Sequence, residues 1–103
     1  MSEPATEPDQ PTYLVARDDA TSRYTVTADG REVGEAEFIL DEGRVLFTHT
    51  EIAKDAGRGG LGTLLVREAL ADVRERGLTV VPLCSFVASY LRRHPEEADL
   101  AEV

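Results

Sequence analysis

The sequence predicts an α+β domain in which a central mixed sheet packs against helices. Two changes of pattern along the chain carry this prediction. Apolar and polar residues alternate between residues 24 and 52, which is typical of half-buried strands, whereas residues 61–76 gather their apolar side chains on one face of a helix. We therefore expect an antiparallel meander of three strands, followed by a helix, a buried strand and a second helix.

The three expected strands are separated by short turn signals. The first is "YTVTA" from Tyr24, and Asp29-Gly30 after it is a strong hairpin turn. "EVGEAEFIL" forms the second strand, "DEGR" at residues 41–44 the next turn, and "VLFTHTEI" the third strand. Short turns of this kind join neighbouring strands in an antiparallel meander.

The second half of the chain alternates between helix and strand. Leu61, Leu65, Ala69, Leu70 and Val73 share one face of the first predicted helix, and Gly77 is a natural stop for it. Gly62 lies on that same face, where a missing side chain would let the helix sit close to the sheet. The apolar run "LTVVPLC" predicts a buried strand, and Ser85 can cap the helix "FVASYLRRH", which Pro95 helps to end.

Length and charge limit the class of protein. The chain has 103 residues, enough for one domain, and we expect a disordered acidic tail over residues 1–12, a single domain over 13–97 and a frayed end over 98–103. The net charge of −9 disfavours nucleic acid and anionic membranes as partners. A single Cys and an N-terminus without a signal-peptide pattern predict a cytoplasmic protein, which we expect to be a monomer or a weak homodimer.

The stretch "DAGRGGLGTLL", residues 55–65, concentrates Gly57, Gly59, Gly60 and Gly62 between the third strand and the first helix. Glycines let the backbone approach an anion closely, and the first amides of a helix have no intrahelical acceptor. Arg58 adds a charge to the same loop. The cluster predicts an anion-binding loop, although a flexible connection is the simpler alternative.

Two phosphate-binding motifs do not fit this loop. The spacing of Gly57, Gly59 and Gly62 matches G-x-G-x-x-G, but the chain lacks the strands of a dinucleotide-binding fold, and "PLC" ends the next strand without an acidic residue for the ribose. A nucleotide P-loop requires Gly-Lys-Ser/Thr, whereas Gly62 is followed by Thr63. Another kind of phosphate is therefore expected.

Three segments together resemble the GNAT N-acetyltransferases, in particular their minimal single-domain branch: "FTHTEI", "GRGGLGTLL" and "VVPLCSFVASYLRRHPE". The resemblance covers about residues 24–97. It departs from the motif Arg/Gln-x-x-Gly-x-Gly/Ala at one place, because the leading Arg/Gln falls at Gly57 and Arg58 lies one position late.

The resemblance implies that acetyl-CoA is the cosubstrate and that its acetyl group passes to a primary amine, on a small molecule or on an exposed protein amine. It implies that the amides of residues 58–63 hold the pyrophosphate and that the strand "FTHTEI" pairs with the pantetheine arm. The cofactor-binding residues implied in this way are Thr50, Ile52, Gly57, Arg58, Gly59, Gly60, Leu61, Gly62 and Thr63.

Acetyl transfer to an amine needs a group that accepts the amine proton. His49 and Glu51 are two residues apart on a strand and therefore share a face. His49 could be the general base with Glu51 orienting it, or Glu51 could act through water, the route that the resemblance suggests. Alternatively, both are ordinary polar residues of a sheet.

Cys84 and Tyr90 are the other candidate catalytic residues. Cys84 lies between a buried strand and the start of a helix, where a thiol can become nucleophilic, so it is a candidate acetyl acceptor; a small buried side chain is the alternative. Tyr90 resembles the tyrosine that protonates the leaving thiolate in larger GNAT enzymes, but packing against Phe86 is the simpler interpretation.

The end of the second predicted helix carries three consecutive basic residues. Arg92, Arg93 and His94 could touch the cofactor's phosphates or complement the dipole of their helix. No Cys/His cluster has the spacing of metal ligands, so no metal is expected.

A second function remains open beside the enzyme. The chain could be a non-catalytic module that binds CoA or acyl-CoA, with Cys84 as a sensor or passive acetyl acceptor. The short turn "DGRE" leaves no room for the extra helices that build an amine pocket in larger relatives. An open pocket would suit a protein terminus or a lysine side chain.

Overall fold

The structure is a computed structural model, and it describes residues 11–54 and 59–101. Five strands form one sheet in the order β1-β2-β3-β4-β5, which confirms the expected α+β class. The elements are β1 Tyr13–Asp18, β2 Arg23–Ala28, β3 Arg31–Asp41, β4 Arg44–Ile52, α1 Leu61–Glu75, β5 Thr79–Pro82, α2 Ser85–Arg93 and the 3-10 helix η1 Pro95–Leu100. Strands β1 to β4 are antiparallel, and β5 runs parallel to β4. The sheet is therefore mixed, as predicted.

The meander has four strands, one more than the sequence predicted, because β1 precedes it. β1 pairs with β2 along its whole length, from Tyr13↔Ala28 to Asp18↔Arg23. The sequence pattern does not reveal β1, because an apolar residue points outward and a charged residue points inward. Leu14 is 63% exposed, whereas only 8% of the Arg17 side chain is exposed. The Arg17 guanidinium lies over the Phe38 ring, 4.9 Å from its centroid, and this contact lets a charged residue occupy a core position.

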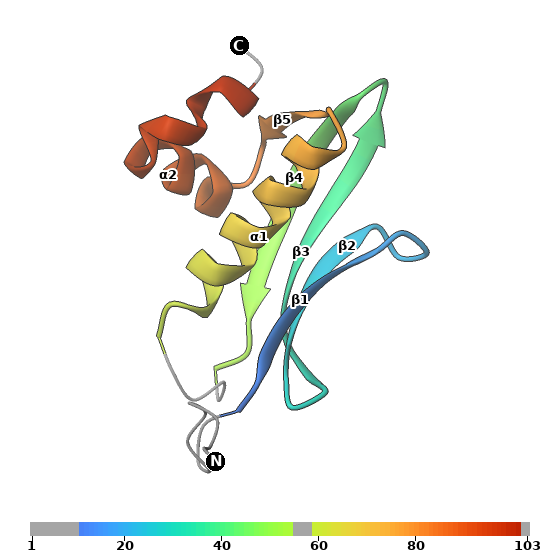
Figure 1. Cartoon of the computed structure of the whole chain (residues 1–103), viewed down its shortest axis with the longest axis vertical. Coiled ribbons are helices and arrows are strands. Elements are labelled where there is room, and N and C mark those ends of the chain that lie inside the picture. The colour runs from blue at the N-terminus through green and yellow to red at the C-terminus, as the bar shows by residue number, and fades with distance from the viewer. Residues whose placement is uncertain (1–10, 55–58, 102–103) are drawn as a thin grey trace, which may run out of the picture.

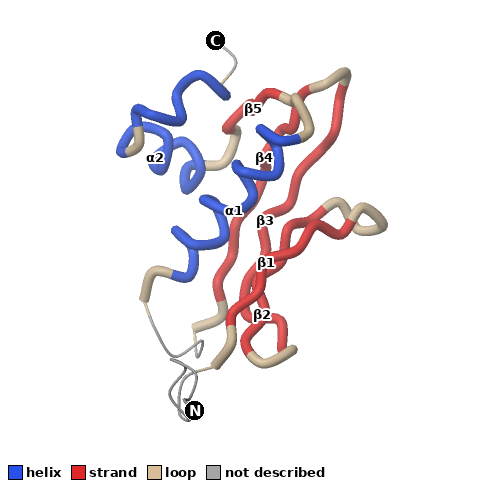
Figure 2. The backbone as a smooth tube through the Cα atoms, viewed as in Figure 1, coloured by secondary structure: helices blue, strands red, loops and turns tan. Residues whose placement is uncertain are grey.

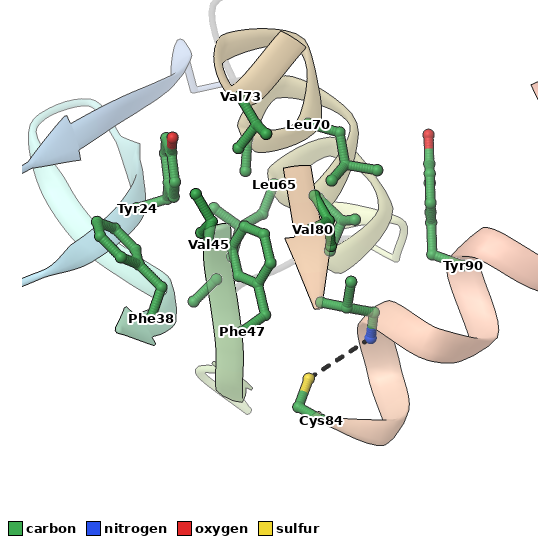
Figure 3. Close-up of a cluster of buried hydrophobic side chains, with 14 of the residues drawn as sticks. Tyr24, Phe38, Val45, Phe47, Leu65, Leu70, Val73, Val80, Cys84 and Tyr90 are labelled. Atoms are coloured by element: carbon green, nitrogen blue, oxygen red, sulfur yellow. Dashed lines mark hydrogen bonds between the residues drawn. The ribbon is translucent and has the colours of Figure 1, made fainter. Parts of the chain in front are cut away.

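The helices lie on one side of the sheet (Figures 1 and 2). α1 contacts each of the five strands, and α2 contacts β4, β5 and α1. Three aromatic rings of the sheet pack together beneath α1, with centroids 5.3 Å apart for Tyr24 and Phe38 and 6.3 Å apart for Phe38 and Phe47 (Figure 3). Among the described residues, no helix combines the length and the hydropathy that a membrane span requires.

The segment after α2 differs from the frayed end that the sequence predicted for residues 98–103. Leu100 is 5% exposed and belongs to the core, and Ala101 forms a parallel bridge with Val80 of β5. Arg74 of α1 donates hydrogen bonds to Glu97 and Asp99 and so ties η1 to α1. Residues 98–101 are thus part of the packed domain.

β4 and β5 separate after a short stretch of pairing. Their register runs from Arg44↔Thr79 to Phe47↔Pro82, and the amide of Cys84 donates a further hydrogen bond to the Phe47 carbonyl at 2.9 Å. At Thr48 the pairing of β4 with β3 shifts by one residue, a β-bulge that bends β4. Thr48 is the extra residue of this bulge, and in the described part of the chain residues 49–52 then pair with β3 alone. The edge of β4 that faces away from β3 is therefore open.

Candidate functional site

The start of α1 is a cluster of backbone amides without a side-chain cap. Gly60 is the N-cap and has a φ of 84°, a left-handed conformation that favours glycine. The first hydrogen bond into the helix comes from the Leu64 amide, which donates to the Gly60 carbonyl at 3.0 Å. The amides of residues 61–63 precede it and point out of the helix end. No acidic residue occupies the first turn, so the positive end of the helix dipole is not neutralised there.

Gly62 brings the second helix to this helix start. A Cβ atom at Gly62 would lie 2.4 Å from Cζ of Phe86, far inside any normal contact. The expected close approach at Gly62 exists, but its partner is α2 rather than the sheet. Phe86 is 36% exposed, so its ring also forms part of the surface beside the loop.

A cavity of about 350 Å³ opens at the start of α1. Its lining combines the N-terminal turn of α1 with single residues of β4 and α2: Ile52, Gly59, Gly60, Leu61, Gly62, Thr63, Phe86 and Arg93. Six of the predicted cofactor-binding residues thus line one cavity, namely Ile52 and residues 59–63. Gly57 and Arg58, predicted for the same role, lie outside the described residues.

Two lining residues come from α2, which the sequence analysis did not assign to the cofactor. Phe86 was assigned to packing, and Arg93 was left open between phosphate binding and the helix dipole. The local sequence around the glycines contains no signal for either residue. Both reach the cavity through the packing of α2 on α1.

Cys84 lies where β4 and β5 separate. It is the N-cap of α2, a role the sequence analysis gave to Ser85, and its Sγ accepts a hydrogen bond from the Val87 amide at 3.5 Å (Figure 3). Sγ also shares a hydrogen bond of 3.3 Å with Oγ1 of Thr50 on β4. Cys84 is 9% exposed. The structure therefore brings together two predicted site residues, Thr50 and Cys84, on the helix side of the open β4 edge.

His49 and Glu51 lie on the opposite face of β4 from Thr50, because successive residues of a strand alternate between faces. Nε2 of His49 is 3.2 Å from Oε1 of Glu51, and both side chains are more than half exposed. This hydrogen bond raises the pKa of His49, and the negative charges of Glu37 and Glu35 on β3 act in the same direction. The imidazole therefore holds its proton to a higher pH than a free histidine.

Glu35 completes a small cluster with these two residues. One ligand atom from each of Glu35, His49 and Glu51 falls within 4.8 Å of the others. A nitrogen and two carboxylates at this spacing could hold a divalent cation, a possibility that the sequence analysis did not foresee. The sequence does not group these residues, because they come from neighbouring strands and have no spacing motif, and Glu35 also forms an ion pair with Arg23.

Tyr90 is buried in the core, with 2% of its surface exposed. Its ring stacks on that of His94 at a centroid distance of 3.9 Å, and its hydroxyl points away from Cys84 (Figure 3). Burial raises the pKa of the Tyr90 hydroxyl. The structure thus does not bring the Tyr90 hydroxyl to the Thr50–Cys84 pair.

Together these features describe a small α+β protein with a bare helix start at one end of an open strand edge. The model of the GCN5-related N-acetyltransferases matches residues 23–100, and the chain belongs to this family. Among solved structures, it is similar to the NMR solution structure of a GCN5-like protein from Staphylococcus aureus, with a TM-score of 0.66 and 19% sequence identity. That match covers 86% of this chain and 87% of the other. No curated protein matches the chain.

Proposed function

We propose that the protein is an acetyl-CoA-dependent N-acetyltransferase that acts on a primary amine. One observation carries the proposal: the cavity at the bare start of α1 shares Ile52 with the open edge of β4. A cofactor with a diphosphate at one end and a chain of amides behind it fits this arrangement. Backbone N–H groups at a helix start bind phosphate, and a free strand edge binds extended amides.

In this proposal the cofactor is held largely by the main chain. The amides of residues 61–63 donate to the diphosphate, and Gly60 gives it close access. The pantetheine arm lies along Thr48–Ile52 like an added strand, in the place that β5 leaves open. Its thioester would then lie near the Thr50–Cys84 pair, where the two strands separate.

The amine approaches from the other face of β4. Its nitrogen must lose a proton before it attacks the thioester carbonyl, and in this proposal neutral His49 accepts that proton. The C–N bond then forms, the C–S bond breaks and the thiolate of CoA leaves. Glu35, Glu37 and Glu51 surround His49 and favour a cationic substrate by their charge. An exposed lysine or a protein N-terminus fits this open surface.

A second candidate function is a CoA-binding module in which Cys84 accepts the acetyl group. The hydrogen bond between Cys84 and Thr50 favours this candidate, because it places the thiol at the open edge of β4, whereas His49 faces the other way. The thiolate would attack the thioester carbonyl, forming an acetyl-cysteine and releasing CoA as its thiol after protonation. With either function, the single cysteine fits a reducing compartment, so we propose a cytoplasmic location.

The test follows CoA release from acetyl-CoA with a panel of amines, including lysine peptides. The enzyme predicts release that depends on the amine and falls at least about tenfold in His49→Ala, as expected for loss of a general base. Glu75→Gln is the matched control, because it removes an exposed charge from α1 away from the site. Release at the same slow rate with every amine would contradict the enzyme.

The intact mass of the protein separates the two candidate functions. An acetyl group on the wild-type chain that is absent in Cys84→Ala would show that Cys84 is acetylated. If that group persists when amines are added, the module is favoured. If an amine removes it, Cys84 carries the acetyl group to the substrate.

A further inference from the structure

We propose that Arg93 binds a phosphate group of CoA beside the backbone amides at the start of α1. The inference rests on the proposed function, since it assigns a further residue to the same cofactor. The cavity at the start of α1 receives two side chains from α2, Phe86 and Arg93, and of these only Arg93 carries a charge. Backbone amides at a helix start carry only partial positive charges, whereas a guanidinium adds a full charge and can form charge-assisted hydrogen bonds to a phosphate.

Arg93 is the last residue of α2 and lines the cavity at the start of α1 together with Gly60 and Thr63. Its position depends on the contact between the helices. Because Gly62 has no side chain, the ring of Phe86 sits directly against α1, and α2 passes close to the loop. The end of α2 is thereby brought to the bare amides of α1.

The charge of Arg93 is not neutralised by a carboxylate in the part of the chain that the structure describes. Its hydrogen-bond partner there is the hydroxyl oxygen of Ser89, at 3.3 Å, which carries no charge. Most other arginines of the described ranges pair with acidic side chains: Arg17, Arg23, Arg44, Arg67, Arg74 and Arg76. In a chain with 20 acidic residues, a guanidinium that faces a cavity without a carboxylate is suited to an anionic ligand.

The simpler role for Arg93, complementing the dipole of α2, does not explain its position. Arg92 lies in the same last turn and serves that role equally well. The two arginines differ in place, since Arg93 lines the cavity and Arg92 is not among its lining residues. Arg92 is therefore a matched control, with the same charge and in the same last turn of the same helix.

The experiment measures the dissociation constant of CoA by calorimetry for the wild type, Arg93→Ala and Arg92→Ala. Loss of charge-assisted hydrogen bonds to a phosphate predicts binding about 10-fold or more weaker in Arg93→Ala, and a change below about 2-fold in Arg92→Ala. The ratio between wild type and Arg93→Ala should shrink as salt is raised from about 0.05 M to about 0.5 M, because ions screen the charge. A packing role would not respond to salt in this way.

Arg93→Lys should bind with intermediate affinity, because it keeps the charge and loses the bidentate geometry. As a measurement that needs no variant, the Nε–H resonance of Arg93 in the wild type should shift on addition of CoA. The inference is overturned if Arg93→Ala binds CoA as tightly as the wild type, or if both variants weaken binding equally. A wild type that binds no CoA would overturn the proposed function itself, so the two failures are distinguishable.

Discussion

His49 combines partial exposure with a carboxylate partner, and this pair determines the pH at which it can act as a base. The hydrogen bond to Glu51 favours the imidazolium, so the pKa of His49 lies above its ordinary value. A base must be neutral to accept a proton. We therefore expect the rate to rise with pH through the pKa of His49, and the rise to lie above the pH at which a free histidine loses its proton.

The first prediction follows from that pair. Glu51→Gln removes the carboxylate charge, so the pKa of His49 should fall and the acid limb of the rate profile should move to lower pH. Titration of the His49 ring by NMR measures the pKa directly and requires no turnover. Glu75→Gln, which removes a charge on the helix side, should leave the titration unchanged. An unchanged or higher His49 pKa in Glu51→Gln would contradict this account of the site.

The second prediction concerns Gly62. An alanine there brings its Cβ to within 2.4 Å of the Phe86 ring, so Gly62→Ala should lower the free energy of unfolding by about 1–3 kcal/mol through overpacking. Gly59→Ala is the control, because a Cβ at Gly59 meets nothing within 4 Å. Urea denaturation measures both variants. In a Phe86→Ala background the cost of Gly62→Ala should vanish; if it persists, the contact with Phe86 is not its cause.

At the scale of elements, the sequence predicts the helices and strands whose apolar side chains repeat with a regular helical or strand period. The helix α1 was expected over residues 61–76 and is observed over Leu61–Glu75, because its apolar residues form one continuous face. β1 was missed, because its inward position holds Arg17, whose charge is met by Asp19 and whose plane covers Phe38. A charged residue at an inward position breaks the alternation of apolar and polar residues, so the pattern does not identify the strand.

The end of the chain was misjudged for a similar reason. Residues 95–101 carry one large apolar side chain, Leu100, so no periodicity identifies them as packed. The burial of Leu100, the bridge between Ala101 and Val80 and the hydrogen bonds of Arg74 show that this segment packs against β5 and the helices. Here one buried side chain, Leu100, together with the bonds of its neighbours Asp99 and Ala101, attaches the segment to the domain.

The third prediction tests that packing with two leucines of opposite exposure. Leu100 is 5% exposed and Leu83 is 61% exposed. Leu100→Ala should lower the free energy of unfolding by about 2–5 kcal/mol, because it leaves a cavity in the core. Leu83→Ala should change it by less than about 0.5 kcal/mol. Equal effects of the two substitutions, measured by thermal or urea unfolding, would show that residues 98–101 do not pack as described.

The part of the candidate site whose residues are adjacent in sequence was predictable. The part whose residues meet only through the tertiary fold was not. The glycines of the loop and the start of α1 are adjacent in sequence, so the anion site that we propose there follows from composition. Arg93 and Phe86 reach the same cavity only through helix packing. Glu35 joins His49 only through the register of β3 and β4. Contacts of this kind depend on the tertiary fold, which one sequence pattern does not encode.

At the scale of the whole molecule, the sheet separates two chemical environments. Its helix side carries the cavity, the amides of α1 and the Thr50–Cys84 pair, whereas its other face carries His49 among acidic side chains. β4 is the element common to both, and its open edge joins them. In our proposal a cofactor bound on the helix side meets an amine from the other face across this single strand.

The most direct test of that account is an amide chemical-shift titration of the ¹⁵N-labelled protein with CoA. We predict that the largest shifts fall on Gly60, Leu61, Gly62 and Thr63, with further shifts along Thr48–Ile52, while amides of β1 remain unchanged. Saturation at a defined CoA concentration would give the affinity from the same data. A spectrum that CoA leaves unaltered at the start of α1 would contradict the central claim that this helix end binds the cofactor's diphosphate.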